Sequence, residues 1–218
     1  MNEPLPPAVL SLAALREEEA ACRRCGLYRD ATQVVPGEGA ARAALMLVGE
    51  QPGDREDLAG KPFVGPAGRI LQQALGEAGI ARDRLYVTNA VKHFKHEQRG
   101  KRRLHKRPDA GEIDACRWWL DLERLLIKPV GILAMGATAA RGVLRRPVTI
   151  AKARGITQTL GDGTWVRVTI HPSFLLRLRE PAEKEAEYRR FVADLETAAE
   201  IAHGARPPSA LREAADPL

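Results

Sequence analysis

The sequence predicts an α/β protein in which a parallel sheet of four strands is covered by helices on both faces. Four short apolar runs end near Gly, Asn or His-Pro, and amphipathic stretches separate them along the chain. Strands that alternate with helices form a parallel sheet, because each helix carries the chain back to the same end. Apolar runs without internal alternation are typical of strands that are buried on both faces.

The first half of the chain contains two of these strands and two helices. Residues 8–25 have helical periodicity and end in a pair of cysteines. The apolar run at 43–50 is stopped by Gly and Pro, which favours a buried strand. Residues 65–80 are amphipathic and predict a helix, and residues 84–91 predict the second strand.

The second half repeats the alternation. Residues 109–128 predict a helix that starts at an aspartate able to cap its first turn. The runs at 129–136 and 164–172 predict the third and fourth strands, and residues 137–144 predict a helix between them. Residues 181–202 predict a long closing helix with proline in its first turn.

The composition favours one globular domain that binds a polyanion. The 218 residues are 44% hydrophobic, which suits a single domain over residues 1–202, and residues 203–218 are expected to be a disordered tail. The net charge of +6 favours nucleic acid as the partner. No apolar stretch is long enough to span a membrane, and the N-terminus lacks a signal-peptide pattern. We therefore expect a cytoplasmic monomer with no membrane partner.

Polar side chains follow three of the four predicted strands. Glu50 and Gln51 follow the first strand, Asn89 ends the second, and His171 and Ser173 follow the fourth. In parallel sheets, ligands bind outside the carboxyl ends of the strands. The sequence therefore predicts a pocket at this edge of the sheet.

The segment between the second strand and the next helix is strongly basic. Residues 92–107 contain eight Lys or Arg and one acidic residue, Glu97. Because this segment leaves a strand at the predicted pocket, phosphate binding explains it better than a solvated charged surface. His105 is its distinctive member, since a neutral imidazole is nucleophilic.

Three motifs resemble the uracil-DNA glycosylase superfamily, close to its iron–sulfur family 4. They are "GEQPGDREDLAGKPFVGPAG" at 49–68, "VTNAVKH" at 87–93 and "TIHPS" at 169–173. Gln51 stands where family 4 has glycine, and "KRRLH" at 101–105 is similar to the signature loop of UdgX-type proteins. The resemblance covers roughly residues 20–200 and implies a three-layer α/β/α sandwich that acts on uracil-containing DNA.

The resemblance assigns roles in binding and releasing the base. Phe63 would stack on an extruded uracil, although an ordinary core position also explains it. Asn89 would read the uracil edge, although it could instead close a turn. His171 would donate a hydrogen bond to uracil O2 as negative charge collects there. The backbone of Gly49 and Gly53 could approach the ligand closely.

For each of two further side chains, the sequence is compatible with two roles. Glu50 could stabilise the cationic sugar or orient a histidine. Ser173 could hold a phosphate or cap the next helix.

Gln51 and His105 together suggest an unusual outcome. The best-known glycosylases have an Asp at the position of Gln51, and an amide cannot act as a base for water. The resemblance implies that His105 instead attacks C1′ of the sugar and forms a stable covalent adduct with DNA. General-base catalysis with turnover, or a phosphate contact, are the alternatives for His105. The basic residues of this loop would bind DNA or hold the loop in place, with the anchoring arginine undecided: Lys101, Arg102 and Arg103.

The three cysteines leave metal or redox chemistry open. An odd number argues against a disulfide scaffold, and the spacing of Cys22 and Cys25 is a moderate metal signal. The resemblance implies a [4Fe–4S] cluster held by these two residues, His93 and Cys116, with His93 where family 4 has cysteine. A structural zinc site, or no metal and a buried Cys116, are the alternatives.

The sequence therefore predicts a uracil-DNA glycosylase that becomes covalently attached through His105, with single-stranded DNA as the preferred partner and uracil as the product. Alternatives are a conventional family 4 glycosylase with turnover, a non-catalytic DNA-binding iron–sulfur protein, and an iron–sulfur redox sensor.

Overall fold

The computed structural model describes residues 11–204 and shows a mixed sheet with a parallel centre. The strand order is β1-β3-β2-β6-β8-β7. The four central strands are parallel to one another, as the sequence predicts: β3 (Tyr86–Asn89), β2 (Leu45–Gly49), β6 (Gly131–Met135) and β8 (Trp165–Thr169).

The sheet is wider than predicted, because an antiparallel strand borders each edge. These edge strands are β1 (Glu38–Gly39) and β7 (Gln158–Thr159). Each is only two residues long, which is too short for a periodic pattern to be recognised. Most of the predicted tail at 203–218 lies outside the described residues.

Successive residues of the central strands supply two different hydrophobic layers. In β2, Leu45 and Leu47 pack on one face of the sheet, whereas Met46 and Val48 pack on the other. This follows from the two-residue period of a β-strand. Both faces are apolar, which is why the run shows no alternation in the sequence.

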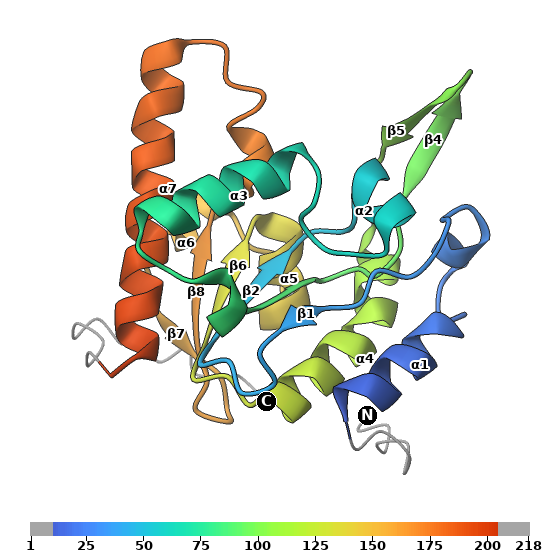
Figure 1. Ribbon diagram of the computed structural model, residues 1–218, viewed down its shortest axis with the longest axis horizontal. Helices are drawn as coiled ribbons and strands as arrows, with labels where there is room; N and C mark the ends of the chain where they lie inside the picture. The colour runs from blue at the N-terminus through green and yellow to red at the C-terminus, as the bar shows by residue number, and fades with distance from the viewer. Residues whose placement is uncertain (1–10, 205–218) are drawn as a thin grey trace.

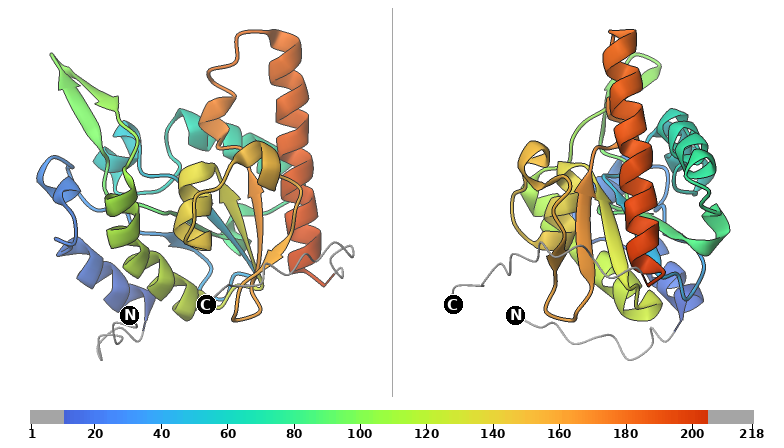
Figure 2. Two further views of the ribbon diagram at one scale, coloured as in Figure 1. Left: turned by 180° about the vertical axis from the view of Figure 1, so that it is seen from behind. Right: turned by 90° about the vertical axis from the view of Figure 1, so that its left-hand side faces the viewer.

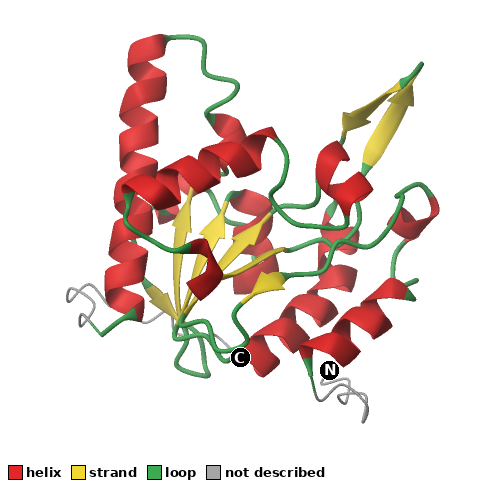
Figure 3. Cartoon of the chain, in the orientation of Figure 1, coloured by secondary structure: helices red, strands yellow, loops and turns green. Residues whose placement is uncertain are grey.

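Helices cover both faces, which confirms the α/β prediction (Figures 1 and 3). On one face lie α3 (Pro66–Glu77) and α7 (Pro181–Ala202). On the other lie α4 (Ala110–Ile127) and α5 (Ala137–Leu144), and α1 (Leu12–Ala20) packs against α4. No helix within residues 11–204 is long and apolar enough to cross a membrane.

The helix boundaries follow local capping chemistry. α1 begins after Ser11, whose hydroxyl caps the first turn by accepting from the Ala14 amide at 3.2 Å. It ends at Ala20, before the predicted end at residue 25, and residues 8–10 of the predicted helix lie outside the described residues. α4 begins after Asp109, which forms a reciprocal capping box with Glu112. Two short helices were not predicted, α2 (Asp54–Ala59) and α6 (Ile150–Ala153).

The basic segment folds into a β-hairpin that projects from the body of the protein (Figures 1 and 2). Its strands are β4 (His96–Arg99) and β5 (Arg102–His105), and the turn uses Gly100 at φ +56°. His96 pairs with His105 at the base of the hairpin. Because side chains alternate along β5, residues 103 and 105 share one face.

Candidate active site

Two adjoining cavities open at the carboxyl ends of the central strands, where the sequence predicts a pocket. One has a volume of about 550 Å³ and is lined by Phe63 and Asn89; we call it the Asn89 cavity. The other has a volume of about 510 Å³ and is lined by Glu50 and Arg107; we call it the Arg107 cavity. The two cavities share several lining residues: Gln51, His105, His171, Ser173 and Arg177.

The Asn89 cavity contains a buried hydrogen-bond acceptor without a partner. Asn89 is 2% exposed, and its Oδ1 has no hydrogen-bond partner within the described residues. Burying a polar atom without a hydrogen-bond partner costs about 1–3 kcal/mol of stability. A ligand that donates a hydrogen bond to this oxygen would therefore bind favourably.

A phenylalanine and a glycine shape the space around Asn89. Phe63 is buried and has φ +56°, an uncommon conformation for a residue with a side chain. A Cβ on Gly49 would collide with both Asn89 Oδ1 and the Phe63 ring. Glycine at this strand end therefore keeps the amide and the aromatic ring close together.

His171 supplies a neutral hydrogen-bond donor at the boundary between the cavities. Its Nδ1 accepts from the Ser173 backbone N–H at 3.2 Å, which places the ring proton of the neutral form on Nε2. This Nε2 is buried and has no partner among residues 11–204. Burial is the main cause that lowers the pKa of His171 to about 4, and the neighbouring Arg177 cation adds to it, so the ring is neutral at pH 7.

Ser173 has a contact that the sequence interpretations did not include. Its Oγ lies 2.8 Å from His171 Nδ1, and Arg177 donates to that Oγ at 3.2 Å. The serine thus fixes the orientation of the imidazole.

Gln51 holds the base of the hairpin through its side-chain amide. Its Oε1 accepts from the Lys95 backbone N–H at 2.9 Å, and its Nε2 donates to the carbonyl oxygens of Lys95 at 3.2 Å and Lys106 at 2.8 Å. Lys95 precedes β4 and Lys106 follows β5. A carboxylate could not make the two donations, so the amide is suited to this position.

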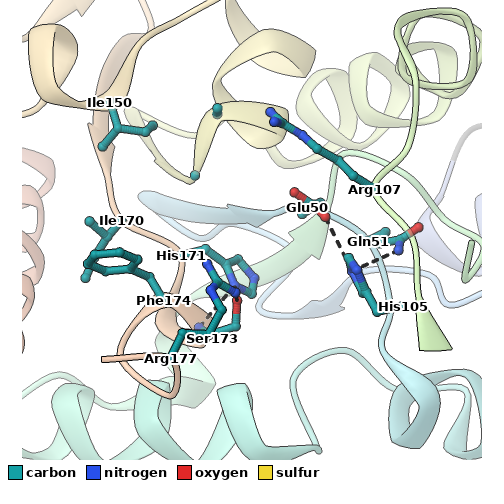
Figure 4. Close-up of a pocket in the computed structure, with 12 residues that line it drawn as sticks. Glu50, Gln51, His105, Arg107, Ile150, Ile170, His171, Ser173, Phe174 and Arg177 are labelled. Carbon is teal, nitrogen blue, oxygen red and sulfur yellow. Dashed lines mark hydrogen bonds and ion pairs between the residues drawn. The ribbon is translucent and has the colours of Figure 1, made fainter. Parts of the chain in front are cut away.

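His105 lies in the wall that the two cavities share (Figure 4). Its Nε2 is 2.9 Å from Gln51 Nε2 and 3.3 Å from Glu50 Oε1. The buried Thr138 donates to Glu50 Oε2 at 2.7 Å and so fixes the carboxylate. This contact places the Glu50 carboxylate beside His105, which is compatible with both roles considered for Glu50.

Arg103 anchors the hairpin to the body of the protein. Its guanidinium contacts Asp54 Oδ1 at 2.7 Å, Asp57 Oδ2 at 2.5 Å and Thr32 Oγ1 at 2.9 Å. The Asp57 side chain is completely buried. Arg102, on the opposite face of the strand, is exposed, as is Lys101 in the turn. The structure thus identifies the anchoring arginine as Arg103.

An Arg103→Met variant is expected to have a mobile hairpin. Removing the guanidinium leaves the buried Asp57 carboxylate without its cation, and breaking such a pair costs about 3–5 kcal/mol. Limited digestion with trypsin should cut between residues 95 and 107 at least tenfold faster than in the wild type. Arg102→Met is the matched control and should digest like the wild type; equal rates for the two variants would contradict this assignment.

The three cysteines lie in one apolar cluster, to which α4 contributes Cys116. Trp119 donates to Cys22 Sγ at 3.0 Å, and the Lys92 backbone N–H donates to Cys116 Sγ at 3.2 Å. Burial raises the pKa of Cys116 to about 12. Within residues 11–204, no group of three or more His, Cys, Asp and Glu side chains is already positioned around a common point that could hold a metal ion. The cysteines of the predicted ligand set share one cluster, but with His93 they do not form a closed site.

A buried ion pair that the sequence did not reveal supports the strand end at Asn89. Lys92 Nζ lies 2.6 Å from Glu123 Oε2 and donates to the Asn89 carbonyl oxygen at 3.1 Å. Both charged side chains are completely buried. A lysine in a basic segment and a glutamate on a helix give no sequence signal of this contact.

Known proteins that are similar to this chain are named for the activity that the site residues suggest. The sequence profile of the uracil DNA glycosylase superfamily matches residues 36–196. The type-4 uracil-DNA glycosylase of Thermotoga maritima is 38% identical over 79% of this chain and 84% of its own length. The protein of that name from Sulfurisphaera tokodaii is 37% identical over 66% of this chain and 65% of its own length. The one from Archaeoglobus fulgidus is 32% identical over 83% of this chain and 91% of its own length. The chain therefore belongs to the uracil DNA glycosylase superfamily.

Proposed function

We propose that this protein excises uracil from DNA, as in base-excision repair, and then stays attached to the abasic sugar through His105. The observation that carries the second part is the position of His105. Its ring lies beside Glu50 in the wall of the cavity that contains Asn89 and His171. The names of the relatives support uracil excision, and the attachment rests on the geometry of this chain.

The Asn89 cavity suits an extruded uracil. Asn89 Oδ1 can accept a hydrogen bond from uracil N3–H, whereas cytosine has no hydrogen at N3 and would leave this acceptor unpaired. The Phe63 ring offers the flat apolar surface on which a flipped base stacks. These two contacts together favour uracil over cytosine.

His171 can stabilise the leaving base. When the bond between C1′ and N1 breaks, its electron pair leaves with uracil and negative charge develops on O2. A preorganised neutral donor such as His171 Nε2–H stabilises that charge without first giving up a bond to another group. The departing uracil anion then takes a proton from water.

His105 can capture the cationic sugar. The Nε2 lone pair forms a bond to C1′, and the resulting imidazolium loses its Nδ1 proton to water. Gln51 Nε2 lies opposite this nitrogen, and its two hydrogens are also within reach of the Lys95 and Lys106 carbonyl oxygens. Gln51 can therefore donate both hydrogens to these carbonyls, which leaves the lone pair of His105 Nε2 free to react. The Glu50 carboxylate at 3.3 Å stabilises the positive charge that forms.

The exposed end of the hairpin provides contacts to the DNA backbone. Lys101 and Arg102 are exposed around the turn, and cations in this position can neutralise phosphates near the cavities.

The cysteine cluster fits an iron–sulfur cofactor by its chemistry. Cys22, Cys25 and Cys116 are soft ligands grouped in one apolar environment, and His93 follows Lys92, whose amide contacts Cys116. We propose that these four residues hold a [4Fe–4S] cluster, which would tie the N-terminal segment to the segment after β3. About four iron and four sulfide per chain in the purified protein would support this, and one zinc with no sulfide would refute it.

A denaturing gel tests the proposed reaction. Wild-type protein incubated with a labelled single-stranded oligonucleotide that contains one uracil should give a band of protein plus DNA that survives boiling in detergent. The amount of this band should equal the amount of uracil released. Free abasic DNA with many turnovers and no shifted band would instead establish a conventional family 4 glycosylase. Salt-dependent DNA binding without uracil release would establish a non-catalytic binding protein.

A further inference from the structure

The reaction described above uses residues on one side of the Arg107 cavity, but it places no part of the DNA inside this cavity. It lies against the Asn89 cavity, and the residues that separate the two include His105 and His171. Its volume of about 510 Å³ is within the range of small-molecule sites, which is roughly 300–1,000 Å³. Because the proposed function places uracil in the Asn89 cavity, this cavity is available to a different group when DNA is bound.

The lining of the Arg107 cavity combines an apolar side with cationic side chains. Ile150, Ile170 and Phe174 lie on one side of the cavity, across from Glu50 and His105 (Figure 4).

Two arginines contribute the positive charge. Arg107 is oriented by a bond from its Nε to Thr138 Oγ1 at 3.3 Å, and Thr138 in turn holds Glu50. Arg177 lies over the Phe174 ring, with its guanidinium carbon 5.9 Å from the ring centroid. A nucleotide has the same two parts, namely a flat base that packs on apolar or aromatic surfaces and a phosphate that attracts arginine.

We propose that the Arg107 cavity binds the nucleotide that adjoins the excised uridine on the same strand. This inference rests on the proposed function. The reacting sugar must lie beside His105, in the wall between the cavities, and the next nucleotide is covalently tethered to that sugar. Its base packs against Ile150 and Phe174, and its phosphate pairs with Arg107 or Arg177.

Occupancy of both cavities requires two neighbouring nucleotides to leave the helical stack. Extruding a base from a duplex costs a few kcal/mol, so a duplex would bear this cost twice, whereas a single strand bears little of it. The two-cavity arrangement therefore gives a physical reason for preferring single-stranded DNA, which the sequence predicted without a mechanism.

Oligonucleotides with a missing neighbour test the inference. Three single-stranded substrates contain one uridine and either normal neighbours, a baseless tetrahydrofuran unit on the 5′ side, or the same unit on the 3′ side. Uracil release under single-turnover conditions should fall about 5- to 150-fold for one of the two sides only, because one stacked base contributes about 1–3 kcal/mol.

A cavity-filling variant links this loss to the Arg107 cavity. In Ile150→Trp, the rate of uracil release from the substrate with normal neighbours should fall. It should reach the rate that the wild type shows with whichever of the two baseless substrates reacts slowly. The baseless unit should then cause no further loss, because both changes remove the same contact. Ile156→Trp is the matched control: Ile156 is 43% exposed, does not line the cavity, and should give wild-type rates on all substrates.

The outcomes separate this inference from the proposed function. Equal rates of uracil release from all three substrates by the wild type would overturn the inference and leave the proposed function intact. The inference would also be overturned if the baseless unit slowed uracil release by Ile150→Trp by the same factor as it slows release by the wild type. Absence of uracil release from every substrate would overturn the proposed function, and the inference with it.

Discussion

A His105→Ala variant is expected to release uracil without becoming attached to DNA. The alanine methyl group has no lone pair, so it cannot form a bond to C1′. Removal of the ring also leaves space in the shared wall of the two cavities through which water reaches the sugar. The heat-stable band of protein plus DNA should disappear completely, and free abasic DNA should appear in its place. Gel densitometry combined with measurement of free uracil checks both results.

His96→Ala is the matched control for this experiment. His96 pairs with His105 across the hairpin, but it lines neither cavity and its ring stacks on Phe94 at 5.0 Å. The same substitution at this position should leave the adduct in place. Persistence of the adduct in His105→Ala would show that another side chain attacks the sugar, and the proposed mechanism would then be wrong.

A His171→Ala variant is expected to release uracil about 10²–10³-fold more slowly, because it loses one preorganised donor to the developing negative charge. The loss should appear in the rate of the chemical step, measured as a single turnover at saturating protein. His203→Ala, at the exposed end of α7, is the control and should keep the wild-type rate. A loss of binding with an unchanged rate for the bound complex would contradict this role of His171.

The same variant should lose part of its sensitivity to acid. The pKa of His171 is about 4 in the folded protein, compared with 6.5 for an unperturbed histidine. Between these values the unfolded chain binds a proton that the folded chain does not, so stability falls as the pH drops from 6.5 towards 4. This residue should account for about 2 kcal/mol of the loss between pH 7 and pH 5. Urea unfolding at both pH values should show a smaller difference for His171→Ala; an unchanged difference would contradict the low pKa.

The part of the fold that the sequence reveals is the part governed by apolar periodicity. The central strands are recognisable because both of their faces are buried, and α5 and α7 have the predicted bounds of 137–144 and 181–202. The hairpin has no such pattern, because most of its side chains are polar or charged. Its position depends on tertiary contacts: Gln51 binds the base of the hairpin, and Arg103 of β5 contacts Asp57 in the body of the protein. Such contacts leave no local signal in the sequence.

The site was predictable to the extent that the topology determines it. Parallel strands bring their carboxyl ends together, so Glu50, Asn89 and His171 converge as expected. The tautomer of His171 depends on Ser173, and the support of Asn89 depends on a buried lysine from the basic segment. Both features arise from distances in the folded protein, which spacing along the chain does not encode.

The side of the hairpin that His105 faces depends on the number of residues that separate it from Arg103 in β5. Arg103 and His105 point to the same side because they are two residues apart, and Arg103 holds that side against Asp54 and Asp57. Inserting or deleting one residue between them would turn the imidazole away from the cavities, while the residues around Asn89 would keep their places. If His105 is the nucleophile proposed above, a single-codon change in the length of this hairpin is enough to convert an enzyme that stays attached to its product into one that turns over, or the reverse.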